Sequence, residues 1–331
     1  MSQKIAICAD VHLSEGSDGT LRRLANGVSA MREIITKTAD MGCSGLFIAG
    51  DRFHDRRSVA VRVLAEASTL FDLASSRGVR LGGIAGNHDL TMDGAHCSCA
   101  GLRWSAFVER SASVIDCCGY SIYAAPWSAW RNSEVKKTKC DIVIGHVGVQ
   151  RARVGSMDFE MEDGDVSKEF IAEFEAPVVL GHYHKPQEFG TGNYYVGSVM
   201  QMDWGEEGEG KRMLIFDGSS LKSVPISSSG KYITTSDRSV AEKSRNCDYV
   251  RLVASDAEEA RKLRKERAKG DLPDRVTVVS EPVDAPEGDV PAGLAHASSA
   301  KQLREWVKRN PPEGVKPKKM RRAGIRILGE S

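Results

Sequence analysis

Residues of the types that bind divalent metals recur in this sequence directly after short apolar segments. The clearest case is Gly181-His182-Tyr183-His184, which follows the apolar run 178–180. Alternate residues of an extended segment point the same way, so both imidazoles can face one spot beyond the strand. Four other apolar segments end in a similar manner, and together the five supply Asp10, His12, Asp51, Asn87, His146, His182 and His184.

The number and the types of these residues indicate a site for two metal ions. Any one aspartate or histidine at a strand end can simply cap a loop, but repetition at five strand ends favours a shared site. Seven nitrogen and oxygen ligands exceed what one ion needs, and two ions that share a bridging carboxylate fit the count. Mixed carboxylate and imidazole ligands suit manganese, iron or zinc.

The elements that must position these side chains alternate between strands and helices in the first part of the chain. Strands are predicted at 4–9, 45–49 and 79–84, and helices at 21–41 and 58–76. This alternation predicts parallel β-α-β units, and the strand-rich texture after residue 113 predicts a second sheet packed face to face with the first. Ligands in such folds lie beyond the carboxyl ends of the strands, so the side chains can converge.

Composition limits the classes of protein to which this chain can belong. The 331 residues carry a formal net charge of +1, so any binding of nucleic acid must come from local patches. No apolar run is long enough to span a bilayer, and the chain enters a strand without a signal peptide. The eight cysteines include no C-x-x-C pair, and the spacing of Cys97 and Cys99 is wrong for a zinc knuckle. We therefore expect a soluble cytoplasmic protein with reduced thiols.

A small second domain is predicted near the C-terminus. A strand at 249–254, a charged helix at 256–269 and a strand at 276–280 form a β-α-β pattern. Ser255 precedes the helix and is a candidate N-cap. We expect these elements to form a separate domain over residues 245–285.

The remaining parts of the chain flank this small domain. The first domain is predicted to cover residues 1–230, and it ends at a serine- and glycine-rich linker at 227–230. Residues 282–291 are rich in proline and acidic residues and read as a second linker. An amphipathic helix at 298–309 and a basic tail follow, so residues 295–331 are expected to dock onto a partner.

Five motifs in this sequence resemble those of the calcineurin-like metallophosphoesterases. They appear in the same order as in that family, and the resemblance covers about residues 4–216. It implies a four-layer α/β/β/α sandwich with two metal ions. The motifs are Asp10-Val11-His12, Gly50-Asp51, Gly86-Asn87-His88-Asp89, Gly145-His146 and Gly181-His182-Tyr183-His184.

The resemblance also implies a role for each residue of the motifs. Asp51 would bridge the two ions, and His88 would be the general acid beside them. Besides Asp51, the first ion would be held by Asp10, His12 and His184. Besides Asp51, the second ion would be held by Asn87, His146 and His182.

Within the family, the sequence is similar to the nuclease subunit of double-strand-break repair complexes, in the SbcD-like branch of bacteria and phages. The similarity lies in Gly50-Asp51-Arg52-Phe53-His54, Gly181–Gln187, Tyr195–Ser198 and Trp204–Glu207. It implies a Mn²⁺-dependent 3′→5′ exonuclease and single-strand endonuclease that works as a homodimer with an SMC-like coiled-coil ATPase, in a bacterial or phage-infected cell. SbcD proteins usually lack a histidine at the position of His54, so the chain mixes features of two branches. We expect His54 to help orient DNA, although it can also be a polar loop residue.

Basic residues near the motifs favour a polyanionic substrate. Each can be an ordinary solvated charge, but as a group beside the ligands they are candidates for binding DNA. These candidates are Arg52, Arg56, Arg57, Arg151 and Arg153. The alternative function is hydrolysis of a small substrate, such as a cyclic nucleotide or a phosphomonoester, which would need neither the small domain nor the basic tail. A non-enzymatic scaffold would require lost ligands, and none is missing.

Overall fold

The computed structural model of the protein describes residues 3–16, 20–91, 94, 96–99, 108–155, 159–161 and 164–280. The chain divides into a unit over residues 1–280 and a second over residues 281–331. The predicted second linker, terminal helix and basic tail therefore lie outside the described residues. Among the residues that are described, no helix is both long and apolar enough to cross a membrane.

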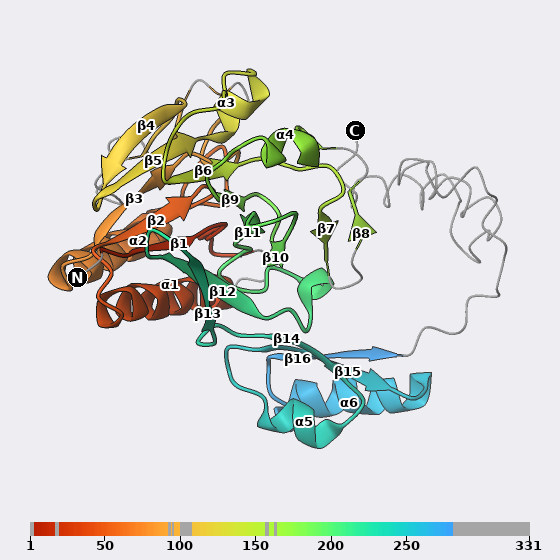
Figure 1. Ribbon diagram of the computed structural model, residues 1–331. Helices are drawn as coiled ribbons and strands as arrows, with labels where there is room; N and C mark the ends of the chain where they lie inside the picture. Colours follow the sequence, from red (N-terminus) through yellow and green to blue (C-terminus); the bar gives the residue numbers. More distant parts are fainter. Residues whose placement is uncertain are drawn as a thin grey trace, which may run out of the picture. The chain divides into compact units, whose positions relative to one another are not determined.

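The first large sheet has five strands in the spatial order β13-β12-β1-β2-β3 (Figure 1). The three strands β1, β2 and β3 run parallel, whereas β12 is antiparallel to both β1 and β13. The strand bounds are β1 (Ile5–Cys8), β2 (Gly45–Ala49), β3 (Arg80–Ile84), β12 (Lys211–Phe216) and β13 (Leu221–Ile226). The β-α-β order predicted for the first part of the chain is thus present.

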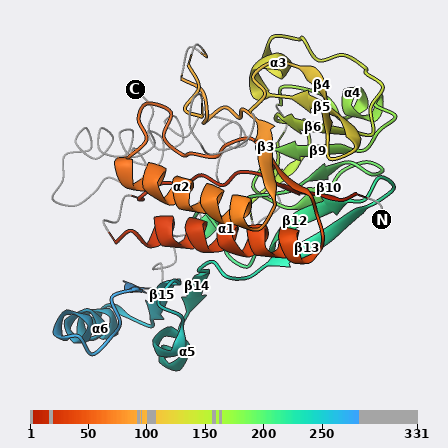
Figure 2. The same cartoon turned by 90° about the vertical axis from the view of Figure 1, so that its left-hand side faces the viewer.

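Two long helices cover the outer face of this sheet. They are α1 (Arg22–Asp40) and α2 (Val61–Ser76), and they lie side by side (Figure 2). Alternate residues of β1 show which face is which, because Ala6 and Cys8 pack with the helices while Ile5 and Ile7 pack on the opposite side.

The second large sheet has six strands in the order β10-β11-β9-β6-β5-β4. Apolar residues of both sheets, among them Ile7, Phe47, Ile144 and Val179, form one buried cluster between them. The short helices α3 (Trp127–Arg131) and α4 (Lys168–Ala172) pack on the outer face. The strand bounds are β4 (Ser113–Cys117), β5 (Tyr120–Ala125), β6 (Ile142–His146), β9 (Val178–Gly181), β10 (Gln187–Glu188) and β11 (Tyr194–Tyr195). The order helix, sheet, sheet, helix confirms the predicted four-layer sandwich.

Two short connecting elements complete this part of the chain. Strands β7 (Arg153–Val154) and β8 (Phe159–Glu160) form a two-stranded ribbon in the segment between β6 and α4. A single 3-10 turn, η1 (Trp204–Glu206), precedes β12, and the side chain of Asp203 caps it by accepting a hydrogen bond from Gly205 N at 2.7 Å.

The small module contains one strand and one helix more than the sequence predicted. Its three strands are parallel in the order β14-β15-β16, and helix α5 connects the first two. The elements are β14 (Tyr232–Thr235), α5 (Arg238–Lys243), β15 (Tyr249–Ala254), α6 (Ala257–Lys269) and β16 (Val276–Ser280). The described module therefore begins at Tyr232, within the stretch that the sequence analysis left between its two domains.

Helix α6 is capped one residue later than expected. Asp256, not Ser255, is the N-cap, and its carboxylate accepts a hydrogen bond from Glu259 N at 2.8 Å. Ser255 contributes differently, because its backbone N–H and its hydroxyl both donate to the Glu259 carboxylate. The cap is therefore reciprocal: the Asp256 side chain accepts from the backbone of Glu259, and the Glu259 side chain accepts from Ser255.

Candidate metal centre

The carboxyl ends of strands from both large sheets meet at one place. Strands β1, β2 and β3 of the first sheet lead to Asp10 and His12, to Asp51 and to Asn87, and strands β6 and β9 of the second sheet lead to the three remaining histidines. Two glycines make the approach possible. A Cβ on Gly50 would lie 2.2 Å from His146 Nδ1, and one on Gly181 would lie 2.2 Å from the Ala49 carbonyl oxygen.

The side chain of Asp51 lies between imidazoles that belong to different strands. Its Oδ2 is 3.5 Å from His12 Nε2 and 3.4 Å from His146 Nε2. The residue is 2% exposed, so bulk solvent screens the charge of this carboxylate little. One carboxylate oxygen that faces two separate histidines has the geometry of a ligand shared by two ions.

One group of donors surrounds His12. The donor atoms of Asp10, His12 and His184 lie within 4.8 Å of one another, and the Nε2 atoms of the two histidines are only 3.2 Å apart. The other ring nitrogen of His184 donates to Glu206 Oε1 at 2.7 Å. That bond fixes the tautomer, so the Nε2 of His184 is left with a lone pair that faces the site.

Glu206 contacts a predicted ligand and is a candidate functional residue that the sequence analysis did not assign. Burial alone would raise the pKa of its carboxyl group, but the hydrogen bond from His184 and the charge of Lys211 lower the pKa to about 2. Lys211 Nζ lies 2.6 Å from Glu206 Oε2. Glu206 is therefore ionised over the whole neutral range and orients His184.

The other group of donors surrounds Asn87. Its Oδ1 is 3.0 Å from His146 Nε2 and 3.1 Å from His182 Nδ1. The second ring nitrogen of His146 donates to the Ala49 carbonyl at 2.8 Å, which again turns the Nε2 toward the site. Burial would lower the pKa of His146, but the charge of Asp51 raises it to about 9. The positive charge of His146 and burial together hold the pKa of His182 at about 3.

These side chains fit two divalent cations. Two histidine nitrogens that face each other at 3.2 Å and a carboxylate oxygen between two imidazoles leave positions that a cation satisfies. Burial raises the pKa of Asp10 to about 6, so the ionised form of this carboxyl group is disfavoured without a nearby cation. Asp10, His12 and His184 would hold one ion, Asn87, His146 and His182 would hold the other, and Asp51 would be shared.

Four of the predicted ligand residues have an unusual backbone conformation. Asp10, His12 and Asp51 have φ angles of 51°, 46° and 53°, and His182 has a φ of 102°. Such conformations cost roughly 1–3 kcal/mol each outside glycine and persist where the surroundings impose them. The loops impose them here through hydrogen bonds such as His12 N to the Asp51 carbonyl at 3.0 Å and His182 N to the Asp10 carboxylate at 3.0 Å.

Arg52 has a structural role and does not face the substrate. Its side chain is fully buried, Nη1 donates to the Ile84 carbonyl at 2.6 Å, and the same atom lies 3.5 Å from Asp89 Oδ2. Asp89 in turn accepts hydrogen bonds from Arg52 N and Gly86 N. The pair braces the loops that carry Asp51 and Asn87, so the prediction that Arg52 binds DNA is wrong.

His88 and His54 lie beside the metal ligands and contact each other. The backbone N–H of His88 donates to Asp51 Oδ1 at 2.7 Å, and its Nδ1 donates to the His54 carbonyl at 2.6 Å. The two rings are stacked with centroids 5.3 Å apart. His54 Nδ1 is 3.4 Å from His12 Nδ1, and ring nitrogens of His12, His54 and His88 also come within 4.8 Å of one another.

The structure places the other predicted arginines at the surface. Arg57, Arg151 and Arg153 are exposed. Arg56 is half-buried, donates to the Leu90 carbonyl at 3.0 Å, and lies over the ring of Trp127 at 5.8 Å. Part of the Arg56 side chain therefore stabilises the loop, while the three exposed arginines remain candidates for contacts with a substrate.

The sequence matches the calcineurin-like phosphoesterase family over residues 3–186. This match takes in all seven predicted ligands. A search of curated proteins finds no match. Among solved structures, a nuclease MPE of Pseudomonas putida aligns with a TM-score of 0.33 and 14% identity, over 66% of this chain and 87% of that chain. A dimetal phosphatase of Danio rerio aligns with a TM-score of 0.38 and 10% identity, over 68% and 99% of the two chains.

Proposed function

Because this chain belongs to the calcineurin-like phosphoesterase family, and is thus a metal-dependent hydrolase of phosphoesters, we propose that its substrate is DNA. The proposed activities are those of a Mn²⁺-dependent 3′→5′ exonuclease and single-strand endonuclease of the SbcD-like type. The proposed setting is recombination and repair in the cytoplasm of a bacterial or phage-infected cell. There the protein would act as a homodimer with an SMC-like coiled-coil ATPase.

The observation that carries the hydrolytic mechanism is the position of Asp51 between His12 and His146. Two cations bound by these residues would neutralise phosphate charge, acidify an attacking water and stabilise the attacking and leaving oxygens of an in-line displacement. The protein's part is to hold the donor atoms in place. The Ala49 carbonyl accepts a hydrogen bond from His146, and Glu206 accepts one from His184. The buried Arg52–Asp89 pair supports the loops that carry Asp51 and Asn87.

His88 is proposed as the proton donor to the leaving oxygen. Its Nδ1 is already committed to the His54 carbonyl, so its Nε2 is the atom that can give a proton. A deoxyribose oxygen is a poor leaving group, and general acid catalysis lowers the cost of its departure. The bond from His88 N to Asp51 ties the position of this ring to the shared metal ligand.

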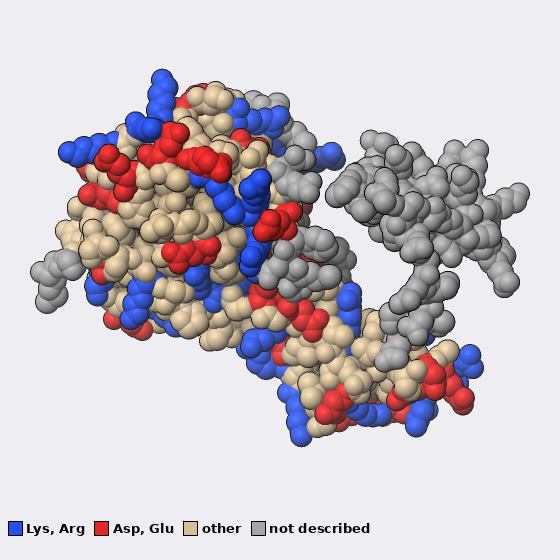
Figure 3. Space-filling model, turned by 45° about the vertical axis from the view of Figure 1, so that its right-hand side comes forward, with Lys and Arg blue, Asp and Glu red and all other residues tan. Residues whose placement is uncertain are grey.

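Support for DNA comes from the sequence motifs and from the small module. The G-D-R-F-H form of the second motif resembles that of the repair nucleases. Basic side chains are spread over the small module between acidic ones (Figure 3). Helix α6 carries six exposed basic residues. These are Arg261, Lys262, Arg264, Lys265, Arg267 and Lys269. Such basic side chains can contact the phosphates of a polymer.

A substrate panel with added Mn²⁺ tests this function. The panel contains duplex DNA, single-stranded DNA, a cyclic nucleotide and a phosphomonoester, each incubated with the full chain and with its Asp51→Asn variant as the inactive control. We expect hydrolysis of both DNA substrates by the wild type alone. Rapid hydrolysis of the phosphomonoester with no action on DNA would reject the proposal.

The docking of an ATPase is proposed for the segment after residue 294. This rests on the apolar stripe of its predicted helix, which is too short to be stable alone. A chain that ends at Ala297 should keep metal-dependent hydrolysis of a simple diester and lose the pull-down of the ATPase. An undiminished pull-down would contradict the proposal.

A further inference from the structure

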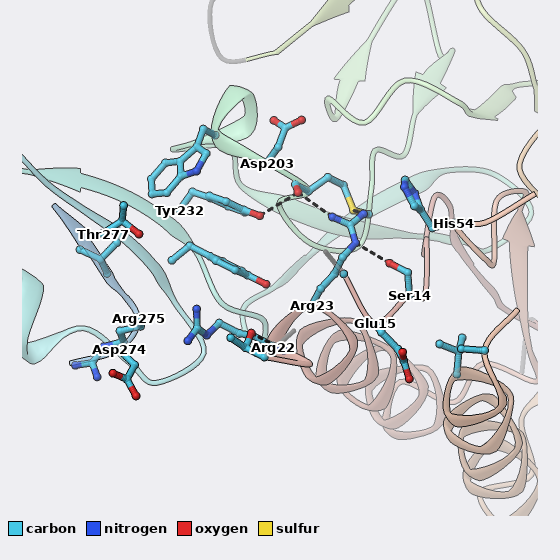
Figure 4. Close-up of a pocket in the computed structure, with 18 of the residues that line it drawn as sticks. Ser14, Glu15, Arg22, Arg23, His54, Asp203, Tyr232, Asp274, Arg275 and Thr277 are labelled. Atoms are coloured by element: carbon cyan, nitrogen blue, oxygen red, sulfur yellow. Dashed lines mark hydrogen bonds between the residues drawn. The ribbon is translucent and has the colours of Figure 1, made fainter. Parts of the chain in front are cut away.

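A cavity of about 790 Å³ lies between the metal-binding domain and the small module. Figure 4 shows His54 on one side of it, and Thr277 and Arg275 of the small module on the other. The ring of His54 is 5.3 Å from that of His12, so the cavity opens beside the metal centre. Its volume is in the range of sites that enclose a small molecule, roughly 300–1000 Å³.

Three aromatic residues of one cavity wall contact one another, and two arginines lie over their rings. Tyr232 and Tyr249, from neighbouring strands, stack with centroids 4.5 Å apart and planes 8° apart. Trp204 meets Tyr232 edge to face at 4.8 Å, and Arg251 lies over Trp204 at 3.8 Å. Arg22 lies over Tyr249 at 5.1 Å, and since Tyr232 occupies one face of that ring, Arg22 covers the other.

The two arginines at the start of helix α1 differ in what holds them. Arg23 donates to Ser14 Oγ at 2.9 Å and to the Met202 carbonyl at 3.0 Å (Figure 4). The Arg22 guanidinium, by contrast, donates to no acceptor among the described residues. A cation in the first turn of a helix is unfavourable, and α1 has no acidic residue there to offset it. The stability of α1 therefore does not explain Arg22.

The charge of the cavity wall argues against binding through a general positive field. Four arginines line the cavity, but so do four carboxylate side chains. Duplex DNA is held mainly by cations that neutralise its phosphates. Unpaired strands, in contrast, are held by basic side chains along the backbone together with aromatic rings on which the bases stack. The composition of this wall suits the second mode.

We propose that this cavity holds an unpaired stretch of the DNA strand that is being hydrolysed. The inference rests on the proposed function and adds that the substrate strand is single-stranded where it lies in the cavity. One base stacks on the face of Tyr249 that the Arg22 guanidinium covers in the free protein. Arg22 moves off the ring and pairs with a phosphate of the same strand. The strand then passes His54 toward the metal centre.

Binding without metal tests the role of Arg22. The full chain with Arg22→Gln is compared with the full chain with Arg32→Gln, which removes a charge from an exposed position of the same helix outside the cavity. Anisotropy of a labelled oligothymidylate and of a duplex of equal length is measured in EDTA over a range of salt concentrations. We expect Arg22→Gln to weaken single-strand binding about five- to tenfold and to reduce the salt slope by about 0.7, the loss of one phosphate contact.

A second pair of variants tests the ring. Tyr249→Leu should weaken single-strand binding roughly tenfold, whereas Tyr249→Phe, which keeps the stacking face, should bind as the wild type does. Equal affinities of the Arg22→Gln and Arg32→Gln chains would overturn the inference. An equal loss on duplex and single strand would overturn it too. Hydrolysis of bis(4-nitrophenyl) phosphate by the wild type with Mn²⁺ is a separate measurement. Its failure would count against the proposed function and leave the binding result to decide on the cavity.

Discussion

The seven side chains proposed as metal ligands lie at the meeting point of two sheets, whereas the side chains of the neighbouring cavity come from a helix start, loops and a separate small sheet. Asp10, Asp51 and His146 are between 0% and 2% exposed, while Arg22, Tyr232 and Tyr249 are half-buried. Two of the metal-binding imidazoles are held from behind by a carbonyl or carboxylate oxygen. The Arg22 guanidinium is held by no hydrogen bond to a described residue.

This difference reflects two chemical tasks. A metal site must hold its donors in a fixed arrangement, and burial, second hydrogen bonds and imposed backbone conformations achieve this. A surface that receives a flexible polymer must let side chains move, so few of its groups can be locked. Substitutions in the metal centre should therefore abolish chemistry, and substitutions elsewhere should have graded effects.

The largest effect is expected for Asp51→Asn. This change removes the charge of the carboxylate whose Oδ2 lies between His12 and His146, so both ions should be lost or greatly weakened. Asn87→Ala removes a neutral ligand from one group and should cost less bound metal. Metal analysis after dialysis against a metal-free buffer measures the difference. Two ions per chain in the Asp51→Asn protein would show that the bridge is placed wrongly.

His88→Asn should keep both ions and slow the cleavage of DNA. General acid catalysis is typically worth about a hundred- to ten-thousand-fold, and we expect a loss in that range. A nitrophenyl ester of a nucleotide releases a group that needs no proton, so its hydrolysis should fall much less. An equal loss on both substrates, or a loss of metal, would indicate that His88 is a ligand or binds phosphate.

The strand ends and long helices were predictable because each depends on local sequence. The helix predicted at 21–41 is observed at Arg22–Asp40, and the one predicted at 58–76 at Val61–Ser76. Apolar runs that end in a glycine and a polar residue pointed in the same way to seven side chains that the fold brings together. Strand β14 was missed because its four residues, Tyr232–Thr235, are too short to show an alternating pattern.

The residues that were misjudged depend on contacts between distant parts of the chain. Arg52 follows Asp51 and reads like the arginines after it, but its partner Asp89 and the Ile84 carbonyl come from another loop and strand. Glu206 is 22 positions from His184, and only the fold brings them to 2.7 Å. The sequence analysis included Glu206 in the Trp204–Glu207 motif, but the local sequence does not show that its carboxylate contacts His184.

Asp89→Asn tests whether the loops of the metal centre depend on the buried pair. The change leaves the Arg52 charge buried without a counterion, and breaking such a pair typically costs about 3–5 kcal/mol. The free energy of unfolding, measured with urea, should fall by about that amount. Asp72→Asn, at an exposed position of helix α2, is the control and should change stability by less than about 0.5 kcal/mol. Equal effects of the two changes on the free energy of unfolding would show that the Arg52–Asp89 pair does not stabilise these loops.

The smallest effect is expected at the junction between helix α1 and the linker that leads to the small module. Glu33 of α1 accepts hydrogen bonds from Lys37 Nζ at 2.6 Å, from Ser227 N at 2.9 Å and from Ser228 N at 2.7 Å. Burial alone would raise the pKa of Glu33, but these donors lower it to about 2 from an ordinary value of 4.5.

Because the pKa of Glu33 is lower in the folded state, its ionised form stabilises the protein above about pH 4.5, and this contribution is lost as the pH falls toward 2. Solvent screening at this partly exposed position reduces it to about 1 kcal/mol. Glu33→Gln should lower the free energy of unfolding by that amount at pH 7, and the difference from wild type should shrink steadily in urea titrations between pH 5 and pH 3. Glu66→Gln on helix α2, whose carboxylate accepts no backbone N–H among the described residues, should show neither effect. A difference for Glu33→Gln that stays constant as the pH falls would mean that the carboxylate's charge does not hold the linker to α1.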